Sequence, residues 1–377
     1  MTTVQEVEMG QREWGFEARS AKPWPLPTTL ETALEVANYA DPEKKSVDLS
    51  VCDNSGASEM VRKEILREVG RNPKLLYLHW DSQDSILRRQ LGELHDVPLD
   101  SIIITSGAMA GIDYSFKVFV SSGVKVGLLT PDFPGFPHYA EGEQAQVEWL
   151  DRLQFPFQFS ADEIAGFARD KKAAFIILSN PSGVTGTMKD RNEIEHIVRS
   201  NPKTFFVIDE ADTIYPDRSS ASLVNTYGNV AFIGSFSKFY GLSGLRMGYM
   251  AVPSSVAGHF RNILNPLEVT SIGLLAARVV LEDKKYQAET QTRVENNLKL
   301  LEYACAGTTY RVVPGSSCLA SYVCSQDADT YVELGKRGIN LAQGKVFGID
   351  SGGRANLGET YKINKLCEAI KEIHGKT

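Results

Sequence analysis

The chain has 377 residues, of which 42% are hydrophobic and 23% charged, which is typical of a globular protein with about two domains. The net charge of −7 argues against nucleic-acid binding and gives no attraction to anionic membranes. No apolar run approaches the roughly 20 residues of a membrane helix, and the first residues do not resemble a signal peptide. The five cysteines are scattered without a C-x-x-C pair, so we expect no disulfide framework, no bound metal and a cytoplasmic location.

The chain begins with a segment for which an extended arm is predicted. Three prolines between residues 22 and 27 exclude a helix there, because each also restricts the residue before it. A short helix is predicted over residues 28–39. We expect an N-terminal arm at 1–45, which can join the small domain, a large domain at 46–265 and a small C-terminal domain at 266–377.

A short strand and two helices are predicted next. The strand begins near Ser46 and breaks into a polar turn before Gly56. Ser58 has the side chain of a helix cap, which predicts a helix from there to about residue 69. Its apolar face is expected to consist of Met60, Ile65, Leu66 and Val69. A second helix is predicted over residues 81–95.

From residue 102 a pattern repeats in which short apolar runs end in small or polar residues and alternate with helical segments. The five runs cover residues 102–104, 124–129, 174–178, 205–208 and 230–233. Runs of this kind are typical of strands buried on both faces, and their alternation with helices predicts a mostly parallel α/β sheet. Ligands of such sheets bind at the carboxyl ends of the strands.

The composition changes after Pro253. Residues 254–305 are expected to be largely helical, with a break at Pro266. Strands are predicted at 309–313, 318–323 and 354–357, and an amphipathic helix at 362–374. These elements predict a smaller α+β domain.

Two strand ends carry residues that point to chemistry. Lys238 follows the run at 230–233, and a lysine at the end of a buried strand is a candidate Schiff-base former, although a solvated loop lysine is the alternative. Asp209 ends the run at 205–208, and a buried carboxylate there needs either a cationic ring nitrogen or a salt bridge as its partner.

Two further strand ends lead into turns of small and polar residues, and an arginine follows the Lys238 loop. Residues 106–111 lie between a strand and a helix expected to begin near Ile112, where backbone N–H groups can approach an anion, or where the chain simply turns tightly. Asn180 begins a rigid turn over residues 180–186 and presents a polar side chain at the strand end. The alternative is an ordinary Asn-Pro turn without a functional role. Arg246 is either an anion-binding fork or a salt-bridged arginine at the edge of the core.

These motifs follow one another in a characteristic order. S-G-A, N-P-S-G-V-T-G, D-E-A and S-F-S-K-x7-R-x-G together resemble the fold-type I pyridoxal-phosphate enzymes of the class I/II aminotransferase group, and most of all its histidinol-phosphate aminotransferase-like branch, over about residues 45–365. The resemblance implies a mostly parallel seven-stranded sheet flanked by helices, with a smaller α+β C-terminal domain. It also implies pyridoxal 5'-phosphate as cofactor, an L-amino acid and a 2-oxo acid as substrates, and a homodimer.

The resemblance also implies roles for single residues. Lys238 matches the internal-aldimine lysine that later moves a proton, Asp209 the partner of the pyridine nitrogen, and Asn180 the donor to the cofactor's 3-oxygen. Phosphate contacts are implied for Gly107, Ala108, Met109, Ser235, Ser237 and Arg246. Phe133 matches the ring on the cofactor face, with a plain core residue as the alternative, and Tyr77 a tyrosine that reaches the neighbouring subunit's phosphate. Substrate contacts are implied for Arg354, which matches the arginine that grips the α-carboxylate, and for Asn54.

The chain departs from the family pattern at two places. Asp212 stands where the family usually has a tyrosine that contacts the 3-oxygen. This carboxylate is either protonated, turned to solvent, used to tune the cofactor or used to bind a cationic substrate, while Tyr215 is a candidate replacement for the tyrosine. Gln343 and Lys345 occupy the region where histidinol-phosphate enzymes tend to have an arginine for the substrate phosphate.

Three classes of function follow. The first is a pyridoxal-phosphate-dependent aminotransferase. The second is a non-transaminating enzyme on the same scaffold (a decarboxylase, an eliminating or replacing enzyme, or a cyclase), because sequence does not show which bond at Cα aligns with the ring. The third is a non-catalytic protein that retains the fold, against which the complete set of Lys238, Asp209, Asn180 and Arg246 argues.

Overall fold

A computed structural model describes residues 47–51, 54, 56–77, 83–325 and 329–375. The predicted arm and the helix predicted at 28–39 lie outside these residues. In the described part of the chain, no helix is long and apolar enough to cross a membrane.

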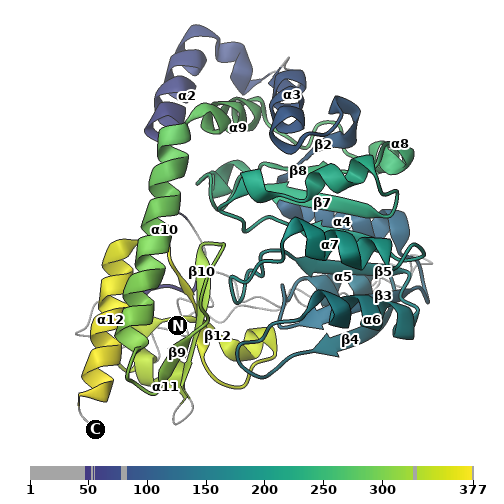
Figure 1. The fold of residues 1–377 in the computed structure, drawn as a ribbon. Helices are drawn as coiled ribbons and strands as arrows, with labels where there is room; N and C mark the ends of the chain where they lie inside the picture. Colours follow the sequence, from purple (N-terminus) through teal and green to yellow (C-terminus); the bar gives the residue numbers. More distant parts are fainter. Residues whose placement is uncertain (1–46, 52–53, 55, 78–82, 326–328, 376–377) are drawn as a thin grey trace, which may run out of the picture.

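A seven-stranded sheet forms the centre of the large part of the molecule (Figure 1). Its spatial order is β2-β8-β7-β6-β5-β3-β4, and β8 alone runs antiparallel to its neighbours. The strands are β2 (Ile102–Thr105), β3 (Lys125–Thr130), β4 (Gln146–Asp151), β5 (Phe175–Ser179), β6 (Phe205–Asp209), β7 (Val230–Ser235) and β8 (Gly248–Ala251). The predicted mostly parallel sheet is therefore confirmed.

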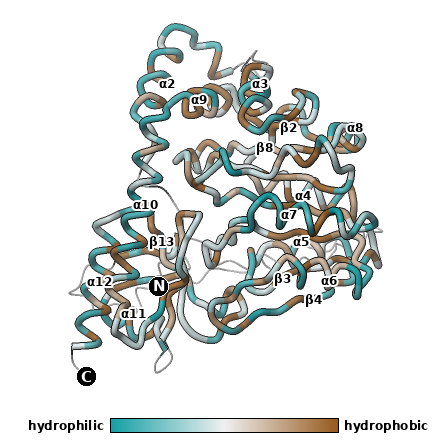
Figure 2. The backbone as a smooth tube through the Cα atoms, in the orientation of Figure 1, coloured by the Kyte–Doolittle hydropathy of each residue, from teal (hydrophilic) through white to brown (hydrophobic). Residues whose placement is uncertain are grey.

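Helices cover both faces of the sheet, which explains the continuous apolar runs. They are α4 (Gly107–Phe119), α5 (Phe136–Gly142), α6 (Ala161–Lys171), α7 (Arg191–Arg199) and α8 (Ser254–Ile263). Along β5, Ile177 packs in the cluster that contains residues of α4, α5 and α8, whereas Ile176 packs with residues of α6 and α7. Alternate side chains thus enter opposite layers, and the strands carry much of the hydrophobic colour in Figure 2.

The smaller part of the molecule is reached through a long helix. After α9 (Ser271–Glu282), α10 (Lys284–Cys305) descends along one side of the molecule and packs against α12 (Thr360–His374) (Figure 1). A four-stranded antiparallel sheet lies beside these helices, in the order β12-β13-β10-β9, together with α11 (Thr330–Gly335). Its strands are β9 (Tyr310–Val312), β10 (Ala320–Ser325), β12 (Ala342–Gln343) and β13 (Gly353–Asn356). The predicted α+β domain is present.

The segment after residue 46 joins this smaller part. β1 (Val47–Asp48) pairs in parallel with β11 (Ile339–Asn340), and Asn356 donates its backbone N–H to Leu49 at 2.9 Å. The three domain ranges expected from the sequence stay a prediction, and this pairing shows that the chain crosses between the two parts near its described beginning.

Two details of the predicted helices are wrong. α4 begins at Gly107 and not near Ile112, because Ala108, Met109 and Ala110 are strong helix formers that offset the glycines on either side. In α2 (Glu59–Arg71), capped by Ser58 as predicted, Met60 and Leu66 are 46% and 76% exposed, and Val61 is the buried apolar residue. α3 (Gln83–His95) agrees with its prediction.

Candidate active site

The carboxyl ends of β3, β5, β6 and β7 bring the predicted residues to one edge of the sheet. Ser179 pairs with Asp209 across β5 and β6, and Asp209 pairs with Ile233 across β6 and β7. The backbone N–H of Asn180 donates to the carbonyl of Asp209 at 2.8 Å. Lys238 follows β7 three residues after its last member. Parallel register alone therefore places Asn180, Asp209 and the Lys238 loop side by side.

The loop after β7 holds Lys238 by backbone and serine contacts. Ser237 donates its backbone N–H to the hydroxyl of Ser235 at 3.0 Å, and both serines are buried. Gly241 donates its backbone N–H to the carbonyl of Lys238 at 3.0 Å. Phe236 and Phe239, on either side, are buried in the core. The half-buried lysine therefore projects from a loop whose backbone is fixed at several points.

The start of α4 and Arg246 form a cradle suited to a dianion. Gly107 adopts φ +76°, and a Cβ there would lie 2.6 Å from Nη2 of Arg246. Arg246 donates from Nη1 to the hydroxyl of Ser237 at 3.5 Å and to the carbonyl of Ser243 at 3.1 Å. The side chain of Ser106 does not cap the helix. First-turn N–H groups, including those of Gly107 and Ala108, have no partner within the helix, so they suit a phosphate.

Asp209 is buried, and no cationic side chain among the described residues pairs with it. Its Oδ1 accepts the backbone N–H of Ala211 at 3.0 Å. Burial, together with the nearby charges of Asp212 and Asp132, raises its pKa to about 8. A carboxylate so placed favours a positively charged partner, which is what a protonated pyridine ring supplies.

The amide of Asn180 is oriented by one backbone segment. Its Oδ1 accepts the N–H of Lys189 at 2.7 Å and its Nδ2 donates to the carbonyl of Lys189 at 3.0 Å. One hydrogen of the amide nitrogen remains for another acceptor. The amide is thus fixed in a direction that suits a hydrogen-bond donor to a bound ring.

The region around Gly183 brings together the predicted carboxylate-binding arginine and Asp212. Arg354, from β13, donates from Nη1 to the carbonyl of Gly183 at 3.2 Å and from Nη2 to that of Ser50 at 2.9 Å. Its guanidinium carbon lies 5.1 Å from the centre of the Phe347 ring. A Cβ on Gly183 would collide with the Asp212 carboxylate. A positive and a negative group therefore flank the same stretch of backbone.

Other predicted residues have different surroundings. The amide of Asn54 donates to the carbonyl of Phe239 at 2.8 Å and to the Tyr286 hydroxyl at 2.9 Å, and it accepts from Arg293 at 2.5 Å. These contacts tie the turn at residue 54 to the Lys238 loop and to α10. The hydroxyl of Tyr215, the candidate substitute for the missing tyrosine, donates instead to Glu295 at 2.6 Å.

The five remaining residues from the sequence analysis are half-buried or exposed. Phe133 is half-buried, with its ring 5.3 Å from that of Phe136 in an edge-to-face arrangement. Tyr77 is 66% exposed. Met109 is 37% exposed at the start of α4. Lys345 is exposed and Gln343 half-buried.

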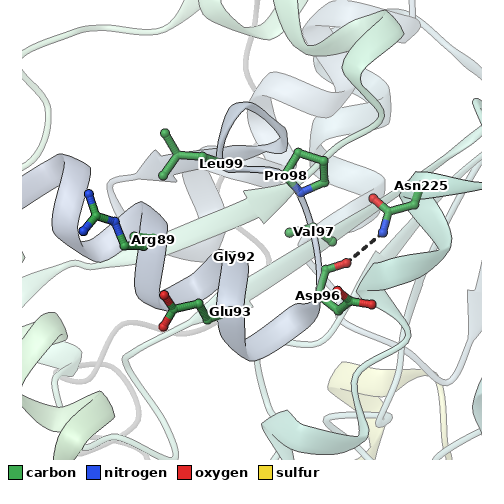
Figure 3. A pocket seen from close by; sticks show the side chains of 8 residues that line it. All are labelled: Arg89, Gly92, Glu93, Asp96, Val97, Pro98, Leu99 and Asn225. Atoms are coloured by element: carbon green, nitrogen blue, oxygen red, sulfur yellow. Dashed lines mark hydrogen bonds between the residues drawn. The ribbon is translucent and has the colours of Figure 1, made fainter.

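Sequence reasoning missed Asp132, which is buried and immediately follows Pro131 at the end of β3. The same strand-end signal that identified Asp209 would have found it. A surface groove at the end of α3 is a separate feature (Figure 3). Its lining combines Arg89, Glu93 and Asp96 with short apolar side chains, and the amide of Asn225 donates to the carbonyl of Asp96 at 2.7 Å. It shares no residue with the candidate site.

Comparisons with known proteins agree with this arrangement. Histidinol-phosphate aminotransferase 3 of Mesorhizobium japonicum is 24% identical over 366 residues, which cover 92% of this chain and 96% of that protein. Histidinol-phosphate aminotransferase of Sinorhizobium fredii is 25% identical over 305 residues, or 79% and 81% of the two chains.

Solved structures show the same fold. Histidinol-phosphate aminotransferase from Sinorhizobium meliloti, in complex with pyridoxal-5'-phosphate, matches with a TM-score of 0.78 and 18% identity over 93% of this chain and 95% of that one. Aspartate aminotransferase from Thermus thermophilus with maleate matches with a TM-score of 0.76 and 15% identity over 92% and 97%. The family model for aminotransferase class I and II matches residues 44–370. The chain therefore belongs to the class I and II aminotransferases, and it is a pyridoxal-phosphate-dependent aminotransferase, as the order of its motifs predicts.

Proposed function

We propose that this aminotransferase holds its cofactor at the carboxyl edge of the central sheet, with Lys238 binding the aldehyde carbon and Asp209 the ring nitrogen. The observation that carries this assignment is the buried Asp209, which forms no ion pair among the described residues and lies on the same sheet edge as the Lys238 loop. Asn180 donates to the 3-oxygen and Phe133 covers one face of the ring. Phosphate contacts come from Gly107, Ala108, Met109, Ser235, Ser237 and Arg246.

The residues divide the chemistry among them. The bound cofactor acts as an electron sink for the substrate's Cα. Asp209 accepts a hydrogen bond from the ring nitrogen and keeps its proton in place, because three further carboxylates nearby favour positive charge there. The Nζ atom of Lys238 would take the proton from the substrate's Cα and release it to the aldehyde carbon of the cofactor.

The substrates are an amino acid and a 2-oxo acid, and we propose that Arg354 binds their carboxylate. Two of its donors already hold the carbonyls of Gly183 and Ser50, which leaves further N–H groups of the fork for a ligand. Nε of Arg354 is buried and has no hydrogen-bond partner among the described residues.

Asp212 supports a finer proposal about the substrate side chain. In the described part of the chain its half-buried carboxylate forms no hydrogen bond or ion pair, although it lies against Gly183 near Arg354. We infer a preference for amino acids with a cationic side chain. Kinetics of Asp212→Asn with lysine-like and neutral amino acids of equal length test this: kcat/KM should fall for the cationic substrate alone, and equal falls would refute it.

We also propose a homodimer in which Tyr77 reaches the neighbouring site. The support is the exposure of Tyr77 together with that of several apolar side chains in the same part of the chain, Met60, Leu66 and Leu76, since exposed apolar side chains of this kind are typical of interfaces. Light scattering should give twice the chain mass, and Tyr77→Phe should weaken cofactor binding without changing that mass. A monomer with full activity would refute the shared site. A cytoplasmic location is proposed from the buried cysteines Cys305, Cys318, Cys324 and Cys367, which form no disulfide with one another.

The lysine assignment has a direct spectroscopic test. Lys238→Ala should lose the absorbance band of covalently attached cofactor, whereas the exposed lysine variant Lys345→Ala should keep it. An unchanged spectrum in Lys238→Ala would overturn the assignment. In the wild-type protein, an amino-acid panel analysed by mass should show a 2-oxo acid product and an amino group passed to a second 2-oxo acid. Release of carbon dioxide, or a product that retains its amino group, would contradict transamination.

A further inference from the structure

Asp132 is a buried carboxylate that joins two strand ends. Only 8% of its surface is exposed, and it follows β3 after Pro131. Its Oδ1 accepts the backbone N–H of Phe133 at 2.7 Å, and its Oδ2 accepts the backbone N–H of Ser179 at 3.1 Å. One side chain thus connects the end of β3 to the end of β5.

Each of these hydrogen bonds leads to a proposed cofactor contact. Phe133 itself supplies the ring over the cofactor. Ser179 directly precedes Asn180, the proposed donor to the 3-oxygen, whose backbone N–H in turn binds the carbonyl of Asp209. Hydrogen bonds to a charged group are stronger than neutral ones. The carboxylate of Asp132 therefore fixes the spacing between the aromatic ring and the amide.

The charge of Asp132 acts on the same site. Burial raises its pKa to about 6, against the hydrogen bonds from Ser179 and Phe133 that lower it, so it is mostly ionised at pH 7 and above. The charged groups that face it are Asp209, Asp212 and the ammonium of Lys189, which donates to the carbonyl of Phe159 at 2.6 Å. A second carboxylate behind Asp209 favours positive charge on whatever Asp209 binds.

We propose that Asp132 is a positioning residue for the cofactor, which holds Phe133 and Asn180 in place and adds a negative charge that helps to keep the ring nitrogen protonated. This inference rests on the proposed cofactor site. The cofactor site and the role of Asp132 can fail separately. If the wild-type protein binds no cofactor through Lys238, the site itself is overturned. If it does bind the cofactor, the variants of Asp132 test the role of Asp132 alone.

The test compares Asp132→Asn with a matched variant, Glu210→Gln. Glu210 is also buried, its pKa is also raised by burial, to about 7, and its charge also reaches Asp209. It accepts hydrogen bonds from the Ser219 hydroxyl and from the Ser220 backbone N–H at 3.0 Å, away from the cofactor contacts. Cofactor affinity is measured by dialysis of apoprotein against pyridoxal phosphate. The protonation state of the bound cofactor is measured by the pH midpoint of its absorbance.

Asp132→Asn should weaken cofactor binding about tenfold or more, the scale of one charged hydrogen bond. It should also move the absorbance midpoint to lower pH by on the order of one unit, because a negative charge that favours the protonated form is gone. Glu210→Gln should leave affinity unchanged and move the midpoint less. A midpoint in Asp132→Asn equal to that of the wild type overturns the proposal, even if affinity falls, since a purely structural residue would change affinity alone.

A second variant protects the test against misfolding. If thermal melting shows that Asp132→Asn does not fold, Asp132→Ser is measured in its place, because a serine hydroxyl can still accept the N–H of a following residue while the charge is absent. The same shift of the midpoint to lower pH is expected, and an unmoved midpoint again refutes the proposal.

Discussion

Gly107 allows the cofactor cradle to be tested separately from the fold. It opens α4 at φ +76°, and an added Cβ would lie 2.6 Å from Nη2 of Arg246. Gly107→Ala therefore has two effects. The left-handed backbone conformation costs an alanine about 1–2 kcal/mol of folding free energy. The methyl group also displaces the guanidinium, which costs the fold little because the guanidinium is the far end of a long, exposed side chain.

The displaced guanidinium lowers cofactor affinity. A hydrogen bond to a charged group contributes about 1.5–3 kcal/mol, so the dissociation constant of pyridoxal phosphate should rise roughly tenfold to a hundredfold. The assay titrates apoprotein with pyridoxal phosphate and follows absorbance. Urea unfolding of the same apoprotein gives the folding term separately.

Gly123→Ala is the matched control. Gly123 has φ +80° and no atom within 4 Å of an added Cβ, so it should lose a similar folding free energy and keep its cofactor affinity. If Gly107→Ala binds the cofactor as tightly as the wild type, or if Gly123→Ala loses as much affinity, then Arg246 does not hold the phosphate.

Three more outcomes are expected. The pKa of Asp209 is raised to about 8, so the folded apoprotein keeps a proton that the unfolded chain releases near pH 4. The free energy of unfolding of the apoprotein should therefore fall as the pH rises from about 4 to 8. Urea titrations should show a smaller fall for Asp209→Asn, and equal falls in the two proteins would contradict this. Asn54→Ala removes hydrogen bonds to Phe239, Tyr286 and Arg293 and should cost about 2–4 kcal/mol in urea unfolding, whereas a raised substrate KM at unchanged stability would assign Asn54 to substrate binding. Gly183→Ala pushes the Asp212 carboxylate aside and should therefore show the same substrate preference as Asp212→Asn. Steady-state kinetics with the same pair of amino acids measure this preference, and a preference equal to that of the wild type would disprove the prediction.

Local patterns identified the parallel sheet and most of its strand ends. Strands buried on both faces must be continuously apolar, so β2, β3, β5, β6 and β7 are visible as runs in the sequence. The same reasoning could not find β4, in which polar and apolar residues alternate at the sheet edge. It also overestimated the burial of α2, because a helical apolar face does not say whether this chain or a partner covers it.

The strand-end positions of Lys238, Asp209 and Asn180 could be predicted from the sequence, since buried apolar runs and their polar ends are properties of short segments. The order of these strands in the sheet, and the contacts that each end makes, come from the tertiary structure. The turn at Asn54 meets α10 and the Lys238 loop, which lie 185 or more residues away along the chain. Asp132 bonds to Ser179, 47 residues away. Hydrogen bonds at such separations depend on the register of the sheet and on the packing of α10, neither of which a local pattern encodes.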